Sequence, residues 1–375
     1  MKSIKVLIVD DSALIRRTLS EILDADPRIE VVGTAADPYF ARDAIKKLNP
    51  DVITLDIEMP RMDGITFLEK LMRARPMPVV VVSSLAEEKA DVTLQALELG
   101  AFTCVEKPKL DLKRRLQGQA EELVALVKAA AGSRVQARPR SAPMPKPSPR
   151  VKTEPVDGPR DGTRHSMDEV LPERRQRTIE TSERVIAIGS STGGTSVIQD
   201  ILAEMPPGCP GIVIVQHMPG GYTAPFAERL DRMVTISVRE AKDGDRIQPG
   251  LALLAPAGSH HTTVQRSGAN YHIRLVEGPR VDRHIPSVNV LFRSMAQEVG
   301  QNGVGVILTG MGDDGADGML EMHESGAPTL AQDEDSCVVF GMPKEAINRG
   351  GVDHIVSRSK LAQAILKNAK TKIRV

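Results

Sequence analysis

Short, continuous runs of β-branched and aliphatic residues constrain the fold of this chain more than any other feature. In its first third they occupy residues 4–9 (IKVLIV), 52–55 (VITL) and 79–82 (VVVV). Between them, apolar residues recur at helical spacing, as in Leu14, Ile15, Leu19, Ile22 and Leu23. This alternation is typical of parallel strands buried on both faces and joined by helices. We therefore expect residues 1–125 to form a doubly wound α/β domain.

A second set of buried-strand patterns begins after residue 182. It comprises residues 185–188, 212–215, 251–254 and 304–308, alternating with helical patterns at 197–202 and 288–299. The sequence therefore predicts a second α/β domain over residues 183–375, with a mainly parallel sheet.

The segment between the two domains differs in composition. From Ser133 to Ser182 it contains eight prolines and eleven Lys or Arg residues against seven acids, and almost no large apolar side chains. Such a segment buries too little surface to offset its ordering entropy. We expect residues 126–182 to be a flexible linker that acts as a tether, although the basic excess could instead form a docking patch.

Overall composition limits the classes of partner. A chain of 375 residues suits two domains and a connector, and its 49 basic and 49 acidic residues give no net field toward nucleic acid or membranes. The three cysteines, Cys104, Cys209 and Cys337, are far apart and odd in number, which argues against a disulfide framework. With no signal-peptide or membrane-spanning pattern, we expect a soluble, cytoplasmic, monomeric protein without membrane insertion or nucleic-acid binding.

Acidic residues follow two of the strands predicted in the first domain. Asp10 and Asp11 come directly after residues 4–9, and Asp56 comes directly after residues 52–55. Carboxyl ends of parallel strands meet at one sheet edge, so these carboxylates should converge there, where oxygen ligands suit Mg²⁺. Ser83 and Lys107, after two further strands, could hold the oxygens of a phosphoryl group on Asp56. Any one of these acids alone is more often a helix N-cap.

The ordered set DDS, LDIEMPRMDG, VSS and EKP over residues 3–125 resembles the receiver domains of two-component response regulators. The resemblance implies a flavodoxin-like fold with five parallel strands and phosphorylation of Asp56 by a histidine kinase. It implies that Asp10, Asp11, Asp56 and the Glu58 backbone bind Mg²⁺, and that Ser83 and Lys107 form the switch. Four further residues would shape the loop after the acceptor: Met59, Pro60, Asp63 and Gly64.

The second domain begins with a strand, a glycine-rich turn and a helix in RVIAIGSSTGGTSVIQDIL. Residues 189–193 fit a Gly-x-Ser-x-Gly elbow, which would present Ser191 at a helix N-terminus. A serine between glycines is also a common helix cap, and such a turn can bind phosphate. The elbow alone is therefore a weak indication of a nucleophile.

Two other strand ends strengthen that interpretation. His217 follows the strand in GIVIVQHMP, and Asp313 and Asp314 follow the strand in GVILTGMGDDG. Serine, histidine and aspartate at one sheet edge are what a catalytic triad requires: a base beside the nucleophile and an acid behind the base. The order Ser, His, Asp differs from the Ser, Asp, His order of α/β-hydrolases.

The other histidines of this domain give weaker indications. We expect His260 and His261 to lie in a loop after APAGS, and His284, in the polar run GPRVDRHIPS, could line a substrate groove. We expect no metal site in this domain, because adjacent histidines rarely ligate one ion together.

Six motifs carry a second resemblance, from about Arg184 to the C-terminus: GSSTGGT, QHMPGGYT, APAGSHH, RHIPSVNVLF, GVILTGMGDDGADGM and SCVVFGMPKEA. They resemble the catalytic domain of the chemotaxis-receptor protein-glutamate methylesterases, the CheB family. The resemblance implies hydrolysis of glutamate γ-methyl esters on methyl-accepting chemotaxis receptors, with release of methanol, and deamidation of certain receptor glutamines.

By the same resemblance, Ser191 is the nucleophile, His217 the base and Asp314 the orienting acid, with Thr192 and the Met311 backbone amide near the oxyanion. This sequence departs from the family at two neighbouring positions, where the family usually has alanine and asparagine: these are Ser190 and Asp313.

Together the two resemblances imply an esterase whose receiver blocks or misorients the active site until Asp56 is phosphorylated. An adaptor that only binds receptor helices is an alternative. A DNA-binding output is disfavoured, because the second domain is sheet-rich and lacks a helix-turn-helix pattern.

Overall fold

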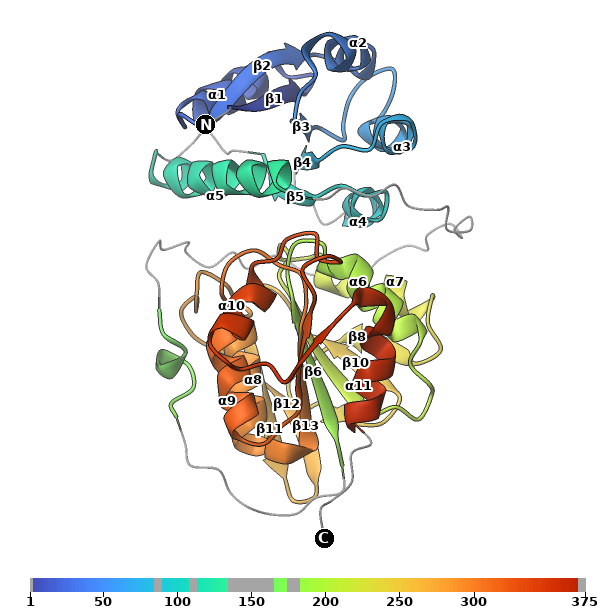
Figure 1. Cartoon of the computed structure of the whole chain (residues 1–375), viewed down its shortest axis with the longest axis vertical. Helices are drawn as coiled ribbons and strands as arrows, with labels where there is room; N and C mark the ends of the chain where they lie inside the picture. Colours follow the sequence, from blue (N-terminus) through green and yellow to red (C-terminus); the bar gives the residue numbers. More distant parts are fainter. Residues whose placement is uncertain (1–2, 84–89, 108–112, 134–164, 174–182, 370–375) are drawn as a thin grey trace. The chain divides into compact units, whose positions relative to one another are not determined.

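The structure is a computed structural model that describes residues 3–83, 90–107, 113–133, 165–173 and 183–369 (Figure 1). The chain divides into two compact units, Met1–Glu154 and Pro155–Val375. Each unit is described by itself. Among the described helices, none is both long and apolar enough to cross a membrane.

The first unit is built on a five-stranded parallel sheet of order β2-β1-β3-β4-β5. Its strands are β1 (Ile4–Val9), β2 (Ile29–Ala35), β3 (Val52–Leu55), β4 (Val79–Ser83) and β5 (Thr103–Glu106). Its helices are α1 (Ala13–Asp24), α2 (Pro38–Leu48), α3 (Gly64–Ala74), α4 (Ala90–Glu98) and α5 (Lys113–Ala131). The predicted doubly wound, flavodoxin-like fold is confirmed, and its strand order reverses between β1 and β3.

Helix α5 continues beyond residue 125, where we expected the first domain to end. It runs to Ala131 because Leu123, Leu126, Val127 and Ala130 are buried at helical spacing, each at most 7% exposed. The last turns of α5 therefore belong to the first unit and not to a flexible linker.

A second part of the expected linker is also ordered. Residues 165–173 contain the 3-10 helix η2 (Met167–Glu169), which is capped by Ser166 and belongs to the second unit. Met167 and Val170 are each only 9% exposed, which explains why this stretch does not behave as the surrounding composition suggests. The rest of the predicted linker, residues 134–164 and 174–182, lies outside the described residues.

The second unit contains a seven-stranded sheet of order β15-β14-β13-β6-β7-β10-β8, parallel throughout. Its strands are β6 (Val185–Ser190), β7 (Gly211–Gln216), β8 (Ser237–Glu240), β10 (Leu251–Leu254), β13 (Gly303–Ile307), β14 (Thr329–Gln332) and β15 (His354–Val356). The predicted α/β domain with a mainly parallel sheet is confirmed.

Helices cover both faces of this sheet (Figure 1). On one face lie α8 (Val288–Glu298), α9 (Ala316–Glu324) and α10 (Met342–Asn348), and on the other α6 (Gly194–Ala203), α7 (Thr223–Asp231) and α11 (Leu361–Ala369). The unit also contains two short 3-10 helices, η3 (Gly300–Asn302) and η4 (Arg358–Lys360). The central strands are buried on both sides, which accounts for their continuous apolar runs.

A small antiparallel sheet was not predicted from the sequence. It consists of β9 (Arg246–Ile247), β11 (His260–Ser267) and β12 (Asn270–Glu277) in the order β11-β12-β9. The expectation that His260 and His261 lie in a loop was wrong, since both begin β11, opposite Glu277 and Val276. The β-branched residues that follow them, Thr262 to Val264, favour this strand and are buried.

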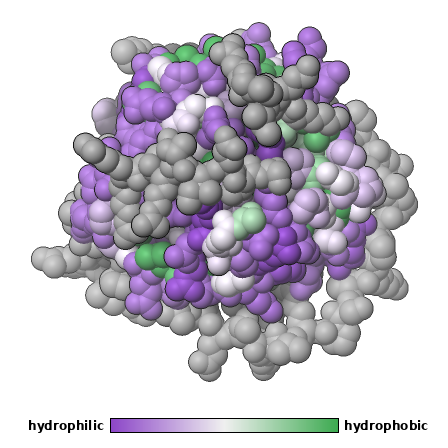
Figure 2. Space-filling view, turned by 90° about the horizontal axis from the view of Figure 1, so that it is seen from below, coloured by the Kyte–Doolittle hydropathy of each residue, from purple (hydrophilic) through white to green (hydrophobic). Residues whose placement is uncertain are grey.

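Each unit has its own hydrophobic core, between its sheet and the covering helices. The face of the molecule drawn in Figure 2 is mainly hydrophilic, and its hydrophobic residues form small, separate patches.

Candidate functional site

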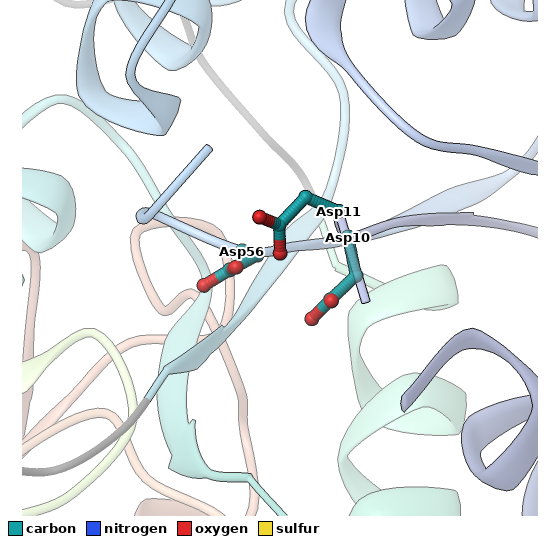
Figure 3. Close-up of side chains that lie close together, drawn as sticks. All are labelled: Asp10, Asp11 and Asp56. Carbon is teal, nitrogen blue, oxygen red and sulfur yellow. The ribbon is translucent and has the colours of Figure 1, made fainter. Parts of the chain in front are cut away.

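The acidic residues of the first unit converge at the point where its strand order reverses. Asp10 directly follows β1 and Asp56 directly follows β3. Carboxylate oxygens of Asp10, Asp11 and Asp56 all lie within 4.8 Å of one another (Figure 3). Asp10 and Asp56 are each 1% exposed, whereas Asp11 is exposed to solvent.

Lys107, just after β5, lies between two of these carboxylates. Its Nζ is 2.8 Å from Asp56 Oδ2 and 2.9 Å from Asp10 Oδ2. Burial, together with the charges of Asp10 and Asp11, raises the pKa of Asp56 to about 6 despite the lowering effect of Lys107. One ammonium therefore does not offset the three carboxylates, and oxygen ligands crowded in this way suit a divalent cation such as Mg²⁺.

The remaining residues predicted for this pocket surround Asp56. The Glu58 backbone N–H donates to Asp56 Oδ1 at 3.2 Å, and the buried Ser83 ends β4, where its carbonyl accepts from the Lys107 backbone N–H. Asp63 caps α3 by accepting from the Thr66 backbone N–H.

The loop after Asp56 packs tightly on the acceptor. A Cβ atom at Gly64 would lie 2.2 Å from the Asp56 carbonyl oxygen, so only glycine fits there. Met59 is 8% exposed, whereas Pro60 is exposed.

In the second unit, Ser191 lies in the expected strand, turn and helix. It is the first residue after β6, its backbone N–H donates to the Thr309 carbonyl at 3.1 Å, and Gly193 turns the chain into α6 with φ of 82°. The strand order reverses between β6 and β13, so Ser191 lies at the switch point, outside the carboxyl ends of the strands, where open parallel sheets commonly bind ligands. The side chain is partly exposed.

The loop after β13 approaches Ser191 closely. A Cβ atom at Gly310 would lie 2.8 Å from Ser191 Cβ, so the glycine lets this loop pack against the serine. Met311 follows in the same loop, and Thr192 follows Ser191 at the start of α6. Thr192 and Met311, the residues predicted to lie near an oxyanion, thus belong to the two segments next to Ser191: the turn into α6 and the loop after β13.

The neighbouring Ser190 is fully buried. Its Oγ donates to Gln216 Oε1 at 2.7 Å. Gln216 Nε2 in turn donates to the carbonyls of Ser191 and His217, both at 2.9 Å. Gln216, which the sequence analysis missed, therefore ties together the two strand ends that carry the serine and the histidine.

His217 lies next to Ser191 and is bound to Asp314. Ser190 pairs with Gln216 in the parallel β6–β7 ladder. Ser191 and His217 directly follow these two residues, so they lie side by side at the ends of neighbouring strands. The His217 Nε2 atom is 2.8 Å from Asp314 Oδ2, and Nδ1 is buried without a hydrogen-bond partner among the described residues. With the ring proton assigned to Nε2 by this carboxylate, Nδ1 keeps a lone pair.

Asp314 is saturated with hydrogen-bond donors from the N-terminus of α8. Its Oδ1 accepts from Ser287 Oγ at 2.7 Å and from the Asn289 N–H at 2.9 Å, and Oδ2 accepts from the Val288 N–H at 2.8 Å. Burial alone would raise the pKa of Asp314, but the hydrogen bond and charge of His217, with the Asn289 amide, hold it at about 2. The carboxylate is therefore ionised at neutral pH.

Asp313 has different partners. Its carboxylate is 3.3 Å from Arg349, which also pairs with Asp317. The two consecutive aspartates thus have different partners, Arg349 for Asp313 and His217 for Asp314.

Two further histidines surround the pair. The His284 ring stacks on His217 with centroids 3.7 Å apart and an interplanar angle of 8°. Although part of His284 reaches the surface, burial, together with the charge of His217, lowers its pKa to about 3, so it is neutral. His261 is fully buried: Nδ1 accepts from the Ser287 N–H at 3.1 Å, and Nε2 donates to the Pro279 carbonyl at 2.8 Å.

Sequence reasoning missed the roles of these two histidines and of Ser287. The signal for Ser287 was present, since a serine directly before the apolar helical segment 288–299 is a typical N-cap.

Among the described residues, the Asp10, Asp11 and Asp56 group is the one set of three or more His, Cys, Asp or Glu side chains that could hold a metal ion.

A phosphoacceptor-type pocket in one unit and a serine, histidine and aspartate site in the other define a response regulator with an enzymatic output domain. Family models agree: residues 6–117 match the response regulator receiver domain, and residues 186–365 match the CheB methylesterase.

Comparisons with known proteins extend over nearly the whole chain. It is 53% identical to protein-glutamate methylesterase/protein-glutamine glutaminase 1 of Geobacter metallireducens, over 96% of this chain and 95% of that protein. It is 52% identical to the protein-glutamate methylesterase/protein-glutamine glutaminase of Nitrosomonas europaea, over 98% and 96%. The chain is also similar to the crystal structure of the Thermotoga maritima CheB methylesterase catalytic domain, with 34% sequence identity and a TM-score of 0.49. The match covers 50% of this chain and 99% of the Thermotoga maritima domain. The chain belongs to the CheB methylesterase family.

Proposed function

We propose that this chain is a phosphorylation-activated serine hydrolase of chemotactic adaptation. It removes methyl groups from glutamate 5-O-methyl esters on methyl-accepting chemotaxis receptors, releasing methanol, and deamidates specific receptor glutamines to glutamate. The observation that carries the proposal is the His217–Asp314 pair beside Ser191, in a chain whose relatives are named for both activities.

The contacts support specific roles in the reaction. Ser191 Oγ attacks the γ-carbonyl of the methylated glutamate while His217 Nδ1 takes its proton, and Asp314 stabilises the imidazolium through Nε2. The backbone N–H groups of Thr192 and Met311 bind the oxyanion. His217 then returns the proton to the methoxide leaving group, and methanol departs.

The acyl-enzyme on Ser191 is hydrolysed by the reverse sequence. A water gives a proton to His217 Nδ1 and attacks the acyl carbon, and the proton then returns to Ser191 Oγ. A glutamine substrate follows the same steps with ammonia as the leaving group. The net reaction consumes one water and leaves a glutamate side chain.

Methanol release from tritium-methylated receptor membranes tests the hydrolase proposal. Ser191→Ala should lower kcat by at least about 10³-fold, because it removes the nucleophile. Ser190→Ala is the matched control: it removes a hydroxyl that donates to Gln216 Oε1, while Gln216 Nε2 keeps its hydrogen bonds to the Ser191 and His217 carbonyls, so most activity should remain. Methanol release that survives Ser191→Ala would exclude Ser191 as the nucleophile, and no release by the wild type would favour the adaptor alternative.

For the first unit we propose that Asp56 accepts a phosphoryl group from a chemotaxis histidine kinase in the cytoplasm. Asp10, Asp11 and Asp56, with the Glu58 backbone, would hold Mg²⁺, and the ion would supply positive charge to this acidic pocket. Lys107 lies within reach of Asp56, and Ser83 ends the adjacent strand, so both can bind phosphoryl oxygens.

A small-molecule phosphodonor tests this switch. Wild-type methanol release should rise on its addition with Mg²⁺, and Asp56→Asn should keep the basal rate but lose the stimulation. Stimulation that is unchanged in Asp56→Asn would refute Asp56 as the phosphoacceptor, and stimulation that persists after magnesium is chelated would refute the metal role.

A further inference from the structure

The segment that joins the two domains contributes an ordered piece to the hydrolase unit. Residues 165–172, here called the linker anchor, begin with His165, which forms a parallel bridge with Val281. The anchor continues through η2, where Ser166 and Glu169 form a capping box. Its carboxyl end is held by Gln297 on α8, whose Nε2 donates to the Pro172 carbonyl at 3.1 Å.

Apolar side chains attach the linker anchor to the unit. Met167 and Val170 pack with Val281 and Val290, which are both 0% exposed. The fit is close at Gly278, where a Cβ atom would lie 2.7 Å from a Val170 methyl group. Burial of these two apolar side chains favours the ordered state of the linker anchor.

A buried arginine attaches the anchor a second time. The Arg293 side chain, 6% exposed, pairs with Asp168 and donates to the Leu171 carbonyl at 3.1 Å. Its Nε also donates to both carboxylate oxygens of Glu321, at 3.0 and 2.9 Å. Arg293 thus keeps one carboxylate partner even when Asp168 is changed.

Both attachment points lead to the catalytic base. Val281 and His284 exchange backbone hydrogen bonds of 3.1 and 2.8 Å, and the His284 ring stacks on His217. Val290 and Arg293 belong to α8, whose N-terminus binds Asp314. The anchor therefore touches the two structures that fix the imidazole: the turn that carries its stacking partner and the helix that holds its carboxylate.

We propose that the linker anchor, through Met167, Asp168 and Val170, positions the base His217 for the hydrolase reaction. The connector is then part of the catalytic unit and acts as more than a tether. This inference rests on the proposed function, because it assumes that His217 is the base.

The full-length chain allows a direct test with methanol release as the readout. Asp168→Asn and Met167→Ala should each lower kcat, and the double variant should lower it by about tenfold, with little change in KM. The physical reason is that small displacements of a catalytic group cost up to about 10²-fold in rate. Met167→Leu keeps the apolar volume and should restore kcat. Asp243→Asn removes an exposed ion pair with Arg274 elsewhere in the same unit and should leave kcat unchanged.

A spectroscopic readout separates positioning from general loss of structure. The low-field proton signal of the His217–Asp314 hydrogen bond, identified by its absence in His217→Gln, should shift or broaden in Asp168→Asn but stay unchanged in Asp243→Asn. If kcat and this signal are both unchanged in Asp168→Asn and Met167→Ala, the inference fails while the proposed function stands. If Ser191→Ala retains activity, the proposed function itself fails.

Discussion

At the scale of single residues, the two consecutive carboxylates after β13 have opposite environments. Asp314 accepts from His217 and from the N-terminus of α8, whereas Asp313 pairs with Arg349. We expect Asp314→Asn to lower kcat by about 10³- to 10⁴-fold, because an amide in that place cannot stabilise an imidazolium. Asp313→Asn, the matched control, should stay within about fivefold of wild type. Equal losses in the two variants of the methanol assay would contradict this assignment.

His284 provides a prediction about acid stability. Its pKa is about 3 in the folded protein against an ordinary 6.5, so the unfolded chain binds this proton more readily. The stability that His284 contributes is therefore complete above pH 6.5 and is lost as the pH falls from 6.5 toward 3. Between pH 6.5 and pH 5 the loss is at most about 2 kcal/mol.

Thermal unfolding at several pH values measures this loss. His284→Phe keeps a ring that can stack on His217 but cannot take up a proton, so its melting temperature should fall less on acidification than that of wild type. Parallel curves for the two proteins would show that His284 does not carry the acid sensitivity.

The sequence predicted Ser191, His217 and an aspartate at 313 or 314 from their positions after strands, and the family resemblance selected Asp314. It could not predict Gln216 or His261 as supports, because their contacts join residues that are distant in the chain. The His261 ring, for example, accepts from the Ser287 N–H. Nothing near His261 in the sequence indicates that partner.

At the scale of elements, the central parallel strands were predictable because both of their faces are buried. The antiparallel β11–β12 pair was not, since its first residues are polar and their partners lie across a hairpin. The ordered η2 was hidden for a related reason. Its apolar residues, Met167 and Val170, are too few to stand out in a proline-rich and basic segment.

The contact between α3 and the end of β3 gives a prediction for the receiver. Gly64→Ala places a methyl group 2.2 Å from the Asp56 carbonyl oxygen, so the backbone at the phosphoacceptor must move. We expect a loss of about 1–3 kcal/mol in the free energy of unfolding of this unit, and weaker phosphodonor stimulation.

Chemical denaturation and the stimulation assay check this expectation. Gly208→Ala is the control, because a Cβ atom at Gly208 would have no neighbouring atom within 4 Å and the change should be nearly neutral. Full stimulation and full stability of Gly64→Ala would show that the loop accommodates the methyl group.

At the scale of the whole molecule, the two units have separate cores and should respond separately to core mutations. Leu68 is 0% exposed in the core of the first unit. Leu68→Ala should lower the free energy of unfolding of that unit by about 2–5 kcal/mol through loss of buried contacts and a cavity. Calorimetry should show the corresponding transition move to lower temperature while that of the hydrolase unit stays.

Leu14→Ala serves as the control for this experiment, because Leu14 is 55% exposed and its truncation leaves no cavity. A matching shift of both transitions in Leu68→Ala would mean that the two units unfold as one cooperative body.

The ordered linker anchor also affects where an isolated fragment of the hydrolase unit should begin. A fragment that starts at residue 183 would leave Val281 and Val290 uncovered and Arg293 with Glu321 alone. A fragment that starts before His165 keeps its own covering. A stable isolated hydrolase unit should therefore begin on the receiver side of the anchor, upstream of His165 and of the first strand of its sheet.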